Sequence, residues 1–471
     1  MRAGALLPGA ALTLALAGCA TAGPDYAPPE TAAANAPSAR GAFVSARDSA
    51  FANAPLPDRW WHLYDDPRLD ALIGQALAAN ADLRAADANL RRADAVVREA
   101  AGQRALSTTA SADAAVERDY SADSGGTNLP GVGTYGLGLT VSYPLDLSGK
   151  LRRAIEASEA GRDAVEAARD AVRISVAAAT ARAYASVCAA NYQIATVEQV
   201  ITLQQETLEA TQRLQKGGRG TAFDVSRART AVETSRANLP ALLAARRNGL
   251  YLLATLLGRP PAEYPRDVES CSTLPRLATP MPVGDGAALI RRRPDIRQAE
   301  RTIAADTARI GVAMADLYPQ VSIGGGLASS GQVADIGSSH SFGFSLGPLL
   351  SWSFPNRPVV KARIAAAGAQ TDADVARFDS AVLEALRGTE TALETYARGR
   401  ERAEALRRAA ASAQVSADQA GKLFHFGRSD FLSLLSAQGA LAAAQVNYAA
   451  AQSELVNQQI AVFLALGGGW Q

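Results

Sequence analysis

The stretch that decides the fold is "YGLGLTVSY" at residues 135–143, in which large apolar side chains alternate with small ones. Such alternation is typical of a β-strand with one apolar face. "FGFSLGPLLSWSF" at 342–354 repeats the pattern, and residues 107–117 and 319–331 carry weaker versions. A run of about ten alternating residues with aromatic side chains at its ends is typical of a transmembrane β-strand. A soluble β-sandwich also alternates but needs no aromatic ends, so the pattern favours the membrane.

The alternation also predicts which face of each strand meets lipid. The large side chains of the first stretch share one face, and Leu139 lies at its centre. Leu346 has the same place in the second stretch. Gly138 and Gly347, with the other small residues, lie on the opposite face, which we expect to border a water-filled lumen.

Four membrane strands predict an oligomer. An open sheet in hydrocarbon leaves unpaired backbone groups that cost several kcal/mol each, so membrane sheets must close into barrels. The smallest such barrels have about eight strands. A chain with four strands must therefore associate, and two chains would supply eight strands while three would supply twelve.

The chain is an internal duplication. Residues 216–258 align with 425–467 through three pairs that are each 209 apart, Gly218/Gly427, Asn238/Asn447 and Gly258/Gly467. The residues from Ala81 align with those from Pro294 at an offset of 213. We therefore divide the chain into a signal peptide (1–18), a lipidated N-terminal segment (19–65), a first repeat (66–275) and a second repeat (276–471).

Each repeat is predicted to contain a helix, two strands, a long helix, a turn and a returning helix. In the first repeat the helices cover 69–103, 151–216 and 221–257, the last bent at Pro240. In the second they cover 286–316, 358–423 and 429–466. A helix over 151–216 would be roughly 100 Å long. Such a helix needs partners along its length, as in a coiled coil.

The N-terminus is typical of a bacterial lipoprotein. Met1-Arg2 and the apolar run that follows form a short secretory signal. The run ends in "LAGC" at residues 16–19, the form of a lipobox, so we expect Cys19 to be acylated. Plain cleavage after the small residues 20–22 is the alternative. Ala20, in place of an aspartate, favours the outer membrane.

Composition argues against several kinds of function. The 47 basic and 46 acidic residues nearly balance, which gives no reason to expect nucleic acid. The 3 histidines are scattered without metal-ligand spacing. "GVGTYG" at 131–136 opens an alternating stretch, not a helix, and so is no dinucleotide loop. We interpret "RRRPDIR" at 291–297 as a solvated face or structural ion pairs, and not as a nucleic-acid contact. The sequence predicts no enzyme, cofactor or metal.

The two remaining cysteines leave one question open. A disulfide between Cys188 and Cys271 would suit the periplasm. The sequence nevertheless favours a buried thiol at Cys188 and a loop thiol at Cys271.

Stretches along nearly the whole mature chain resemble TolC-like outer-membrane efflux proteins, and specifically their NodT-type lipoprotein branch. "DPRLDALIGQALAANADLRAA" at 66–86 resembles their first helix, and three other stretches also carry the resemblance. They are "GPDYAPP" at 23–29, "RRPDIRQAERTIAADTARIGVAMADLYPQVSIGGG" at 292–326 and "FGRSDFLSLLSAQGALAAAQ" at 426–445. The resemblance implies a homotrimer with a 12-stranded outer-membrane β-barrel continued by a helical tunnel. It also implies a passive export duct opened by a periplasmic adaptor protein and an inner-membrane RND pump.

The resemblance also implies where partners and the gate lie. The two turns farthest from the outer membrane are implied to contact the adaptor; they comprise Gly217, Gly218, Arg219, Gly220, Gly427, Arg428 and Ser429. In the family, carboxylates that match Ser433 or Ser436 form rings facing the pore, so those rings are missing here. Leu432 would then be the main constriction.

Asp224 matches a family position that holds the closed state through a basic partner. The family's basic residue aligns with Ser429, and Arg428 is the nearest candidate in this chain. A helix N-terminal charge with no role in gating is the plainer interpretation of Asp224.

Two other functions remain open on the sequence alone. One is the outer-membrane component of a type I protein secretion system, against which the lipobox and "RRPDI" argue. The other is a non-conducting periplasmic scaffold or adhesin.

Overall fold

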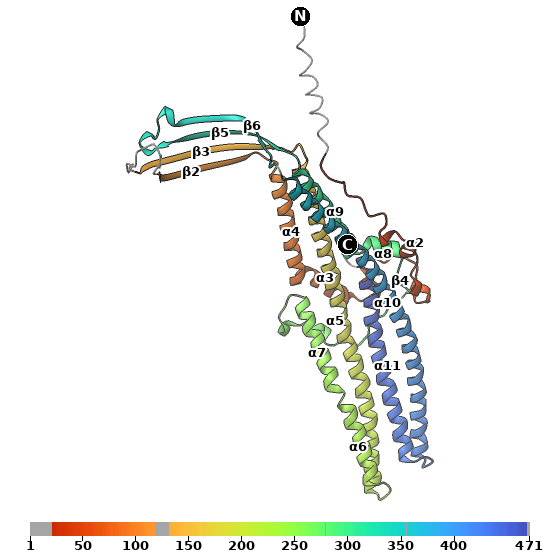
Figure 1. The fold of residues 1–471 in the computed structure, drawn as a ribbon. Coiled ribbons are helices and arrows are strands. Elements are labelled where there is room, and N and C mark those ends of the chain that lie inside the picture. The colour runs from red at the N-terminus through yellow and green to blue at the C-terminus, as the bar shows by residue number, and fades with distance from the viewer. Residues whose placement is uncertain (1–20, 118–130, 278, 355, 469–471) are drawn as a thin grey trace. The chain divides into compact units, whose positions relative to one another are not determined.

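The computed structural model describes residues 21–117, 131–277, 279–354 and 356–468 (Figure 1). Cys19 and the expected signal peptide lie outside them. The chain forms two compact units, and each takes segments from both halves of the sequence. The first contains the residues up to Pro29, Asn89–Glu166 and Gln298–Phe378; the second contains Glu30–Ala88, Ala167–Arg297 and Asp379–Gln471.

The first unit holds a four-stranded antiparallel sheet in the order β2-β3-β5-β6 (Figure 1). The strands are β2 (Ser107–Glu117), β3 (Val132–Leu145), β5 (Gln320–Gln332) and β6 (Phe342–Ser351). All four predicted strands are therefore confirmed. The last of them ends at Ser351 and not at residue 354.

The register of the sheet agrees with the predicted faces. Leu139 on β3 lies opposite Ala110 on β2 and Leu327 on β5, and Leu327 lies opposite Phe344 on β6. Residues that lie directly opposite share a face. Phe344 and Leu346 are 81% and 82% exposed. The sheet thus presents large apolar side chains to its surroundings, as a lipid-facing sheet would.

The other face of the sheet carries small and polar residues. Gly138 lies opposite Ser111 and Ala328, and Ala328 lies opposite Gly343. The next row along the strands joins Thr109, Thr140, Gly326 and Ser345. No side chain in either row is larger than threonine.

Two helices are exceptionally long. α5 (Lys150–Lys216) has 67 residues and α10 (Arg357–His425) has 69, so each is roughly 100 Å long. The other helices are α2 (Pro37–Arg40), α3 (Pro67–Ala79), α4 (Ala81–Gly102), α6 (Ala222–Arg236), α7 (Leu239–Leu256), α8 (Gly286–Arg292), α9 (Pro294–Ala315) and α11 (Phe431–Ala465). Among the described residues, no helix combines the length and the apolar character that crossing a membrane requires.

Three predicted helices are each divided in two. The helix expected at 69–103 breaks at Asn80, whose side chain caps α4 by accepting the backbone N–H groups of Asp82 and Leu83. The helix expected at 286–316 breaks before Pro294. The helix expected at 221–257 breaks near Pro240 instead of bending there. A proline inside a helix lacks one N–H and clashes with the carbonyl four residues earlier. α11 contains no proline and is continuous.

The N-terminal segment of the second unit is mostly irregular. Its strand β1 (Phe51–Ala52) pairs in parallel with β4 (Met281–Pro282). Trp60 is fully buried and stacks on Phe463 of α11, with ring centroids 4.7 Å apart.

Short 3-10 helices occur in both units. They cover Ala33–Asn35, Val44–Arg47, Trp60–Tyr64, Pro261–Glu263, Arg266–Val268, Val333–Asp335 and Ser339–Ser341.

Within the first unit, the chain from Thr21 to Tyr26 is held against α5 by Arg153. This buried guanidinium donates to the carbonyls of Ala22 and Gly23 and to the carboxylate of Asp25. A Cβ on Gly311 of α9 would come within 2.7 Å of the Ala22 carbonyl oxygen, so only glycine lets the segment pass so closely. The segment therefore has a fixed path from its first described residue.

The preference for free thiols at Cys188 and Cys271 was wrong, because the structure joins them in a disulfide. Cys188 lies in α5, and Cys271 lies in the connection between α7 and α8. Asn191, one turn after Cys188, donates to the carbonyls of Glu269 and Cys271. The connection is thus held against α5 across a sequence separation of 83, a proximity that sequence spacing does not reveal.

Candidate functional site

The two turns that follow the long helices have the same geometry. Gly218 and Gly427 both adopt a positive φ, +69° and +65°. Arg219 donates its backbone N–H to the Leu214 carbonyl, and Arg428 donates to the Leu423 carbonyl. Both are Schellman motifs, in which glycine takes the left-handed position that ends a helix. The repeat therefore extends to the hydrogen bonds of its turns.

The helices that return from these turns are capped by the same pair of groups in exchanged positions. In the first repeat, Thr221 is the N-cap and Asp224 stands three residues later, and each side chain accepts the other's backbone N–H. In the second, Asp430 is the N-cap and Ser433 donates its N–H and its hydroxyl to that carboxylate. Position 224 corresponds to 433, since 433 − 224 = 209. The capping carboxylate of the second repeat thus belongs to Asp430, the N-cap residue, and not to position 433, which is a serine.

Within one chain, the candidate gate residues Asp224 and Ser433 make helix-capping hydrogen bonds. The Asp224 carboxylate accepts the hydroxyl of Thr221 at 2.6 Å. The ion pair between Asp224 and Arg428 stays a prediction. Hydrogen bonds from Ser433 lower the pKa of Asp430, which therefore remains a carboxylate at neutral pH.

Leu432, Ser433 and Ser436 are all exposed on α11. Leu432 has a counterpart that the sequence analysis missed. Phe223 is the second residue of α6, Leu432 is the second residue of α11, and 432 − 223 = 209. The two side chains are 67% and 51% exposed. The offset between the repeats was the signal that could have identified Phe223.

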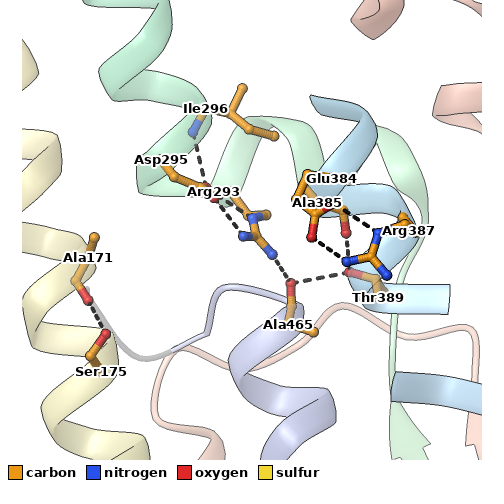
Figure 2. A network of polar contacts seen from close by, with 10 residues as sticks. All are labelled: Ala171, Ser175, Arg293, Asp295, Ile296, Glu384, Ala385, Arg387, Thr389 and Ala465. Carbon is orange, nitrogen blue, oxygen red and sulfur yellow. Dashed lines mark hydrogen bonds and ion pairs between the residues drawn. The ribbon is translucent and has the colours of Figure 1, made fainter. Parts of the chain in front are cut away.

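A second feature is a hollow of about 600 Å³ in the second unit, between α5, α10, α11 and the start of α9. Its apolar lining includes Ala171, Ile174, Ala392, Ala461 and Leu464. Arg293, Asp295, Glu384 and Arg387 also border it. Figure 2 shows these four charged side chains together.

The polar groups beside the hollow hold the end of α11. Arg293 donates to the carbonyl of Ala465, the last residue of α11, at 2.6 Å, and Thr389 donates to the same oxygen at 3.2 Å (Figure 2). The remaining Arg293 donors bind the carboxylate of Asp295. A cation at the C-terminal end of a helix is favourable because the last carbonyls are partly negative. The "RRRPDIR" stretch thus contributes a structural ion pair between Arg293 and Asp295, one of the two roles expected for it.

The described residues contain no group of three or more histidine, cysteine, aspartate or glutamate side chains placed to hold a metal ion. The candidate site therefore consists of two helix turns, the caps of the helices that follow them, and a hollow between helices.

Comparisons with known proteins agree with this fold. Nodulation protein T of Rhizobium leguminosarum bv. trifolii is 28% identical over 461 residues, covering 97% of this chain and 96% of that protein. The toluene efflux pump outer membrane protein TtgC of Pseudomonas putida is 29% identical over 474 residues, covering 99% and 96%.

Solved structures give the same result. The outer-membrane channel OprN is 35% identical with a TM-score of 0.87, covering 96% of this chain and 100% of that chain. The open state of the MtrE outer membrane channel of Neisseria gonorrhoeae is 25% identical with a TM-score of 0.81, covering 96% and 99%. The predicted fold class, four membrane strands with long tunnel-type helices, is thereby confirmed.

A family model described as "Outer membrane efflux protein" matches residues 72–259 and 287–468, one match in each half of the chain. These residues make up most of the sequence, and the chain belongs to the outer membrane efflux protein family.

Proposed function

We propose that this outer-membrane efflux protein works as a homotrimeric, passive duct of a tripartite RND system, opened by a periplasmic adaptor and an inner-membrane pump. The observation that carries the proposal is the four-stranded sheet with one exposed apolar face. Within the described part of the chain, its edge strands β2 and β6 have no further partner. In a membrane those edges must pair with other chains, and three chains give twelve strands.

The relatives' names favour efflux over type I protein secretion. TtgC is named for toluene efflux, and CusC of Escherichia coli is named as a cation efflux system protein. Both names describe export of small solutes or ions.

The proposal is tested by recording conductance in planar bilayers and by cross-linking in native membranes. We expect discrete channels and a cross-linked trimer. Dimers alone would contradict the twelve-stranded barrel, and a protein that assembles without conducting would be a scaffold. Neighbouring genes for an adaptor with an RND pump, rather than an adaptor with an ABC exporter, would separate the two export systems.

Acylation of Cys19 is supported by the path of the chain that follows it. Thr21 packs against Gly149, which lies four residues after the end of β3. Cys19 therefore precedes, by two residues in the sequence, a segment that is held near the end of a membrane strand. We expect Cys19→Ser to remove the lipid and to reduce assembly more than conductance, because the barrel also anchors the trimer. Intact-mass spectrometry checks this, and an unmodified mature protein beginning at Thr21 or Gly23 would disprove it.

Gly218 and Gly427 are proposed to lie at the adaptor-contacting turns, with Gly217, Arg219, Gly220, Arg428 and Ser429. Replacing either with tryptophan is expected to reduce efflux and adaptor cross-linking, because a bulky side chain alters the turn and strains its positive φ. Gly421→Trp is the matched control, since Gly421 lies inside α10 and a Cβ there also meets open space. Unchanged cross-linking in both turn variants would contradict the proposal that these turns contact the adaptor.

Leu432, Asp224 and Arg428 are proposed to hold the duct closed. Leu432→Ala is expected to raise the conductance of resting trimers, because it shortens the exposed apolar side chain that we place at the constriction. Asp224→Ala and Arg428→Ala should have smaller effects, since an exposed ion pair contributes about 0–1 kcal/mol. Arg213→Ala serves as the control. Control-like conductance in all three variants would place the gate elsewhere.

A further inference from the structure

We infer that the hollow between α5, α10 and α11 is a binding site for a small amphipathic solute with an apolar body and an uncharged polar head. The inference rests on the proposed export function for the source of that solute. Its structural basis is separate from that of the proposed duct. Every residue that lines the hollow lies in the second unit, whereas the sheet that carries the duct proposal lies in the first.

The corresponding place in the first repeat is closed. Gly249 of α7 corresponds to Gln458 of α11, since 458 − 249 = 209. A Cβ on Gly249 would come within 2.7 Å of the Ser186 hydroxyl oxygen and 2.8 Å of a Val187 methyl group on α5. The absence of a side chain therefore lets α7 lie directly on α5.

The second repeat places a long side chain where the first has none. The amide of Gln458 lies against Gly399 of α10, where a Cβ would overlap its oxygen. Gln458 also lines the hollow. The two repeats therefore fill this position differently, with direct contact between helices at Gly249 and with the Gln458 side chain beside the hollow in the second repeat.

The helix end beside the hollow differs in the same direction. Asn80, which is buried, donates to the carbonyl of Leu256 at the end of α7. The corresponding donor in the second repeat is Arg293, which binds Ala465 at the end of α11. Both offsets match the duplication, since 293 − 80 = 213 and 465 − 256 = 209. The longer arginine performs the same task and also borders the hollow.

Glycine at position 388 keeps the space empty. A Cβ on Gly388 of α10 would meet nothing within 4 Å. Alanines from all three helices line the same space. A volume of about 600 Å³ lies within the range of small-molecule sites, roughly 300–1,000 Å³.

The charges at the rim favour an uncharged head. Arg387 pairs with Glu384 at 2.8 Å, and Arg293 pairs with Asp295 at 2.9 Å. A charged ligand would have to compete with these pairs and leave one partner uncompensated. A neutral head can instead hydrogen-bond to the Thr391 and Thr395 hydroxyls, which line the hollow, while its apolar body covers Ile174 and Leu464.

The test uses the full-length protein in lipid nanodiscs and 4-nitrophenyl β-glucoside, a water-soluble probe with an aromatic body and a neutral polyol head. Equilibrium dialysis against empty nanodiscs should show saturable binding. Gly388→Leu should weaken it at least tenfold by filling the space. Gly421→Leu, on the same helix and also facing open space, should leave it unchanged. Glucose, which lacks the apolar body, should not compete.

Several outcomes would overturn the site. They are absence of saturable binding, equal binding by Gly388→Leu and the unmodified protein, or tighter binding of 4-nitrophenyl phosphate than of the glucoside. Ala461→Leu fills the hollow from α11 and repeats the test if Gly388→Leu does not assemble. Conductance of the same samples tests the proposed function separately. A conducting protein without probe binding loses only the site, and a binding protein without conductance loses only the duct.

Discussion

Leu346→Arg is expected to reduce the amount of assembled protein in the outer membrane more than tenfold. Leu346 lies at the middle of β6, is 82% exposed and shares a face with the other large apolar side chains of the sheet. An arginine on the lipid face near the bilayer midplane costs about 2–4 kcal/mol, and a trimer would incur that cost three times. The yield of trimer in purified outer membranes measures the effect.

Gly347→Asp is the matched control for that experiment. Gly347 is the next residue on the same strand and lies on the opposite face, where a Cβ would meet nothing within 4 Å. Its carboxylate should therefore enter water without a clash. Gly138→Asp is a poorer control, because a Cβ at Gly138 would come within 2.6 Å of the Ser111 hydroxyl oxygen. Equal losses for Leu346→Arg and Gly347→Asp would mean that the faces are reversed.

The strands and long helices could be predicted because their sequence patterns are local. Alternation from Tyr135 to Tyr143 requires an extended chain with two different faces. The residues between Leu151 and Lys216 include no proline to interrupt a helix. Offsets of 209 and 213 then transferred each assignment to the other half of the chain.

The break at Asn80, the disulfide and the hollow could not be predicted, because they depend on residues distant in sequence. Asn80 ends a helix partly because the Leu256 carbonyl, 176 residues away, accepts its amide. Cys271 reaches Cys188 because the intervening chain folds back on α5. The hollow depends on which side chains lie between the packed helices, and the equivalent positions Gly249 and Gln458 differ in this respect. Periodicity reports which face of a helix is buried but not how far away its partner lies.

Removing the disulfide with Cys188→Ser and Cys271→Ser is expected to lower the free energy of unfolding of the second unit by about 4 kcal/mol. The bond closes a loop of 83 residues, for which the loss of unfolded-chain entropy corresponds to roughly 4–5 kcal/mol. Both residues are buried, so two serine hydroxyls would also need new hydrogen-bond partners. Thermal unfolding of the purified protein, with and without a reductant, measures the loss.

The same variant separates the bond from the contacts around it. Asn191 still holds the carbonyls of Glu269 and Cys271, and Val268 stays in its buried position, so the connection between α7 and α8 should loosen without leaving α5 altogether. We therefore expect faster proteolysis within residues 257–285 while the trimer persists at low temperature. Asn191→Ala with the cysteines intact is the control, and it should lose less stability because the covalent link remains. A reductant should destabilise the unmodified protein but not the double serine variant. If both respond alike, the two cysteines are not joined in the folded protein.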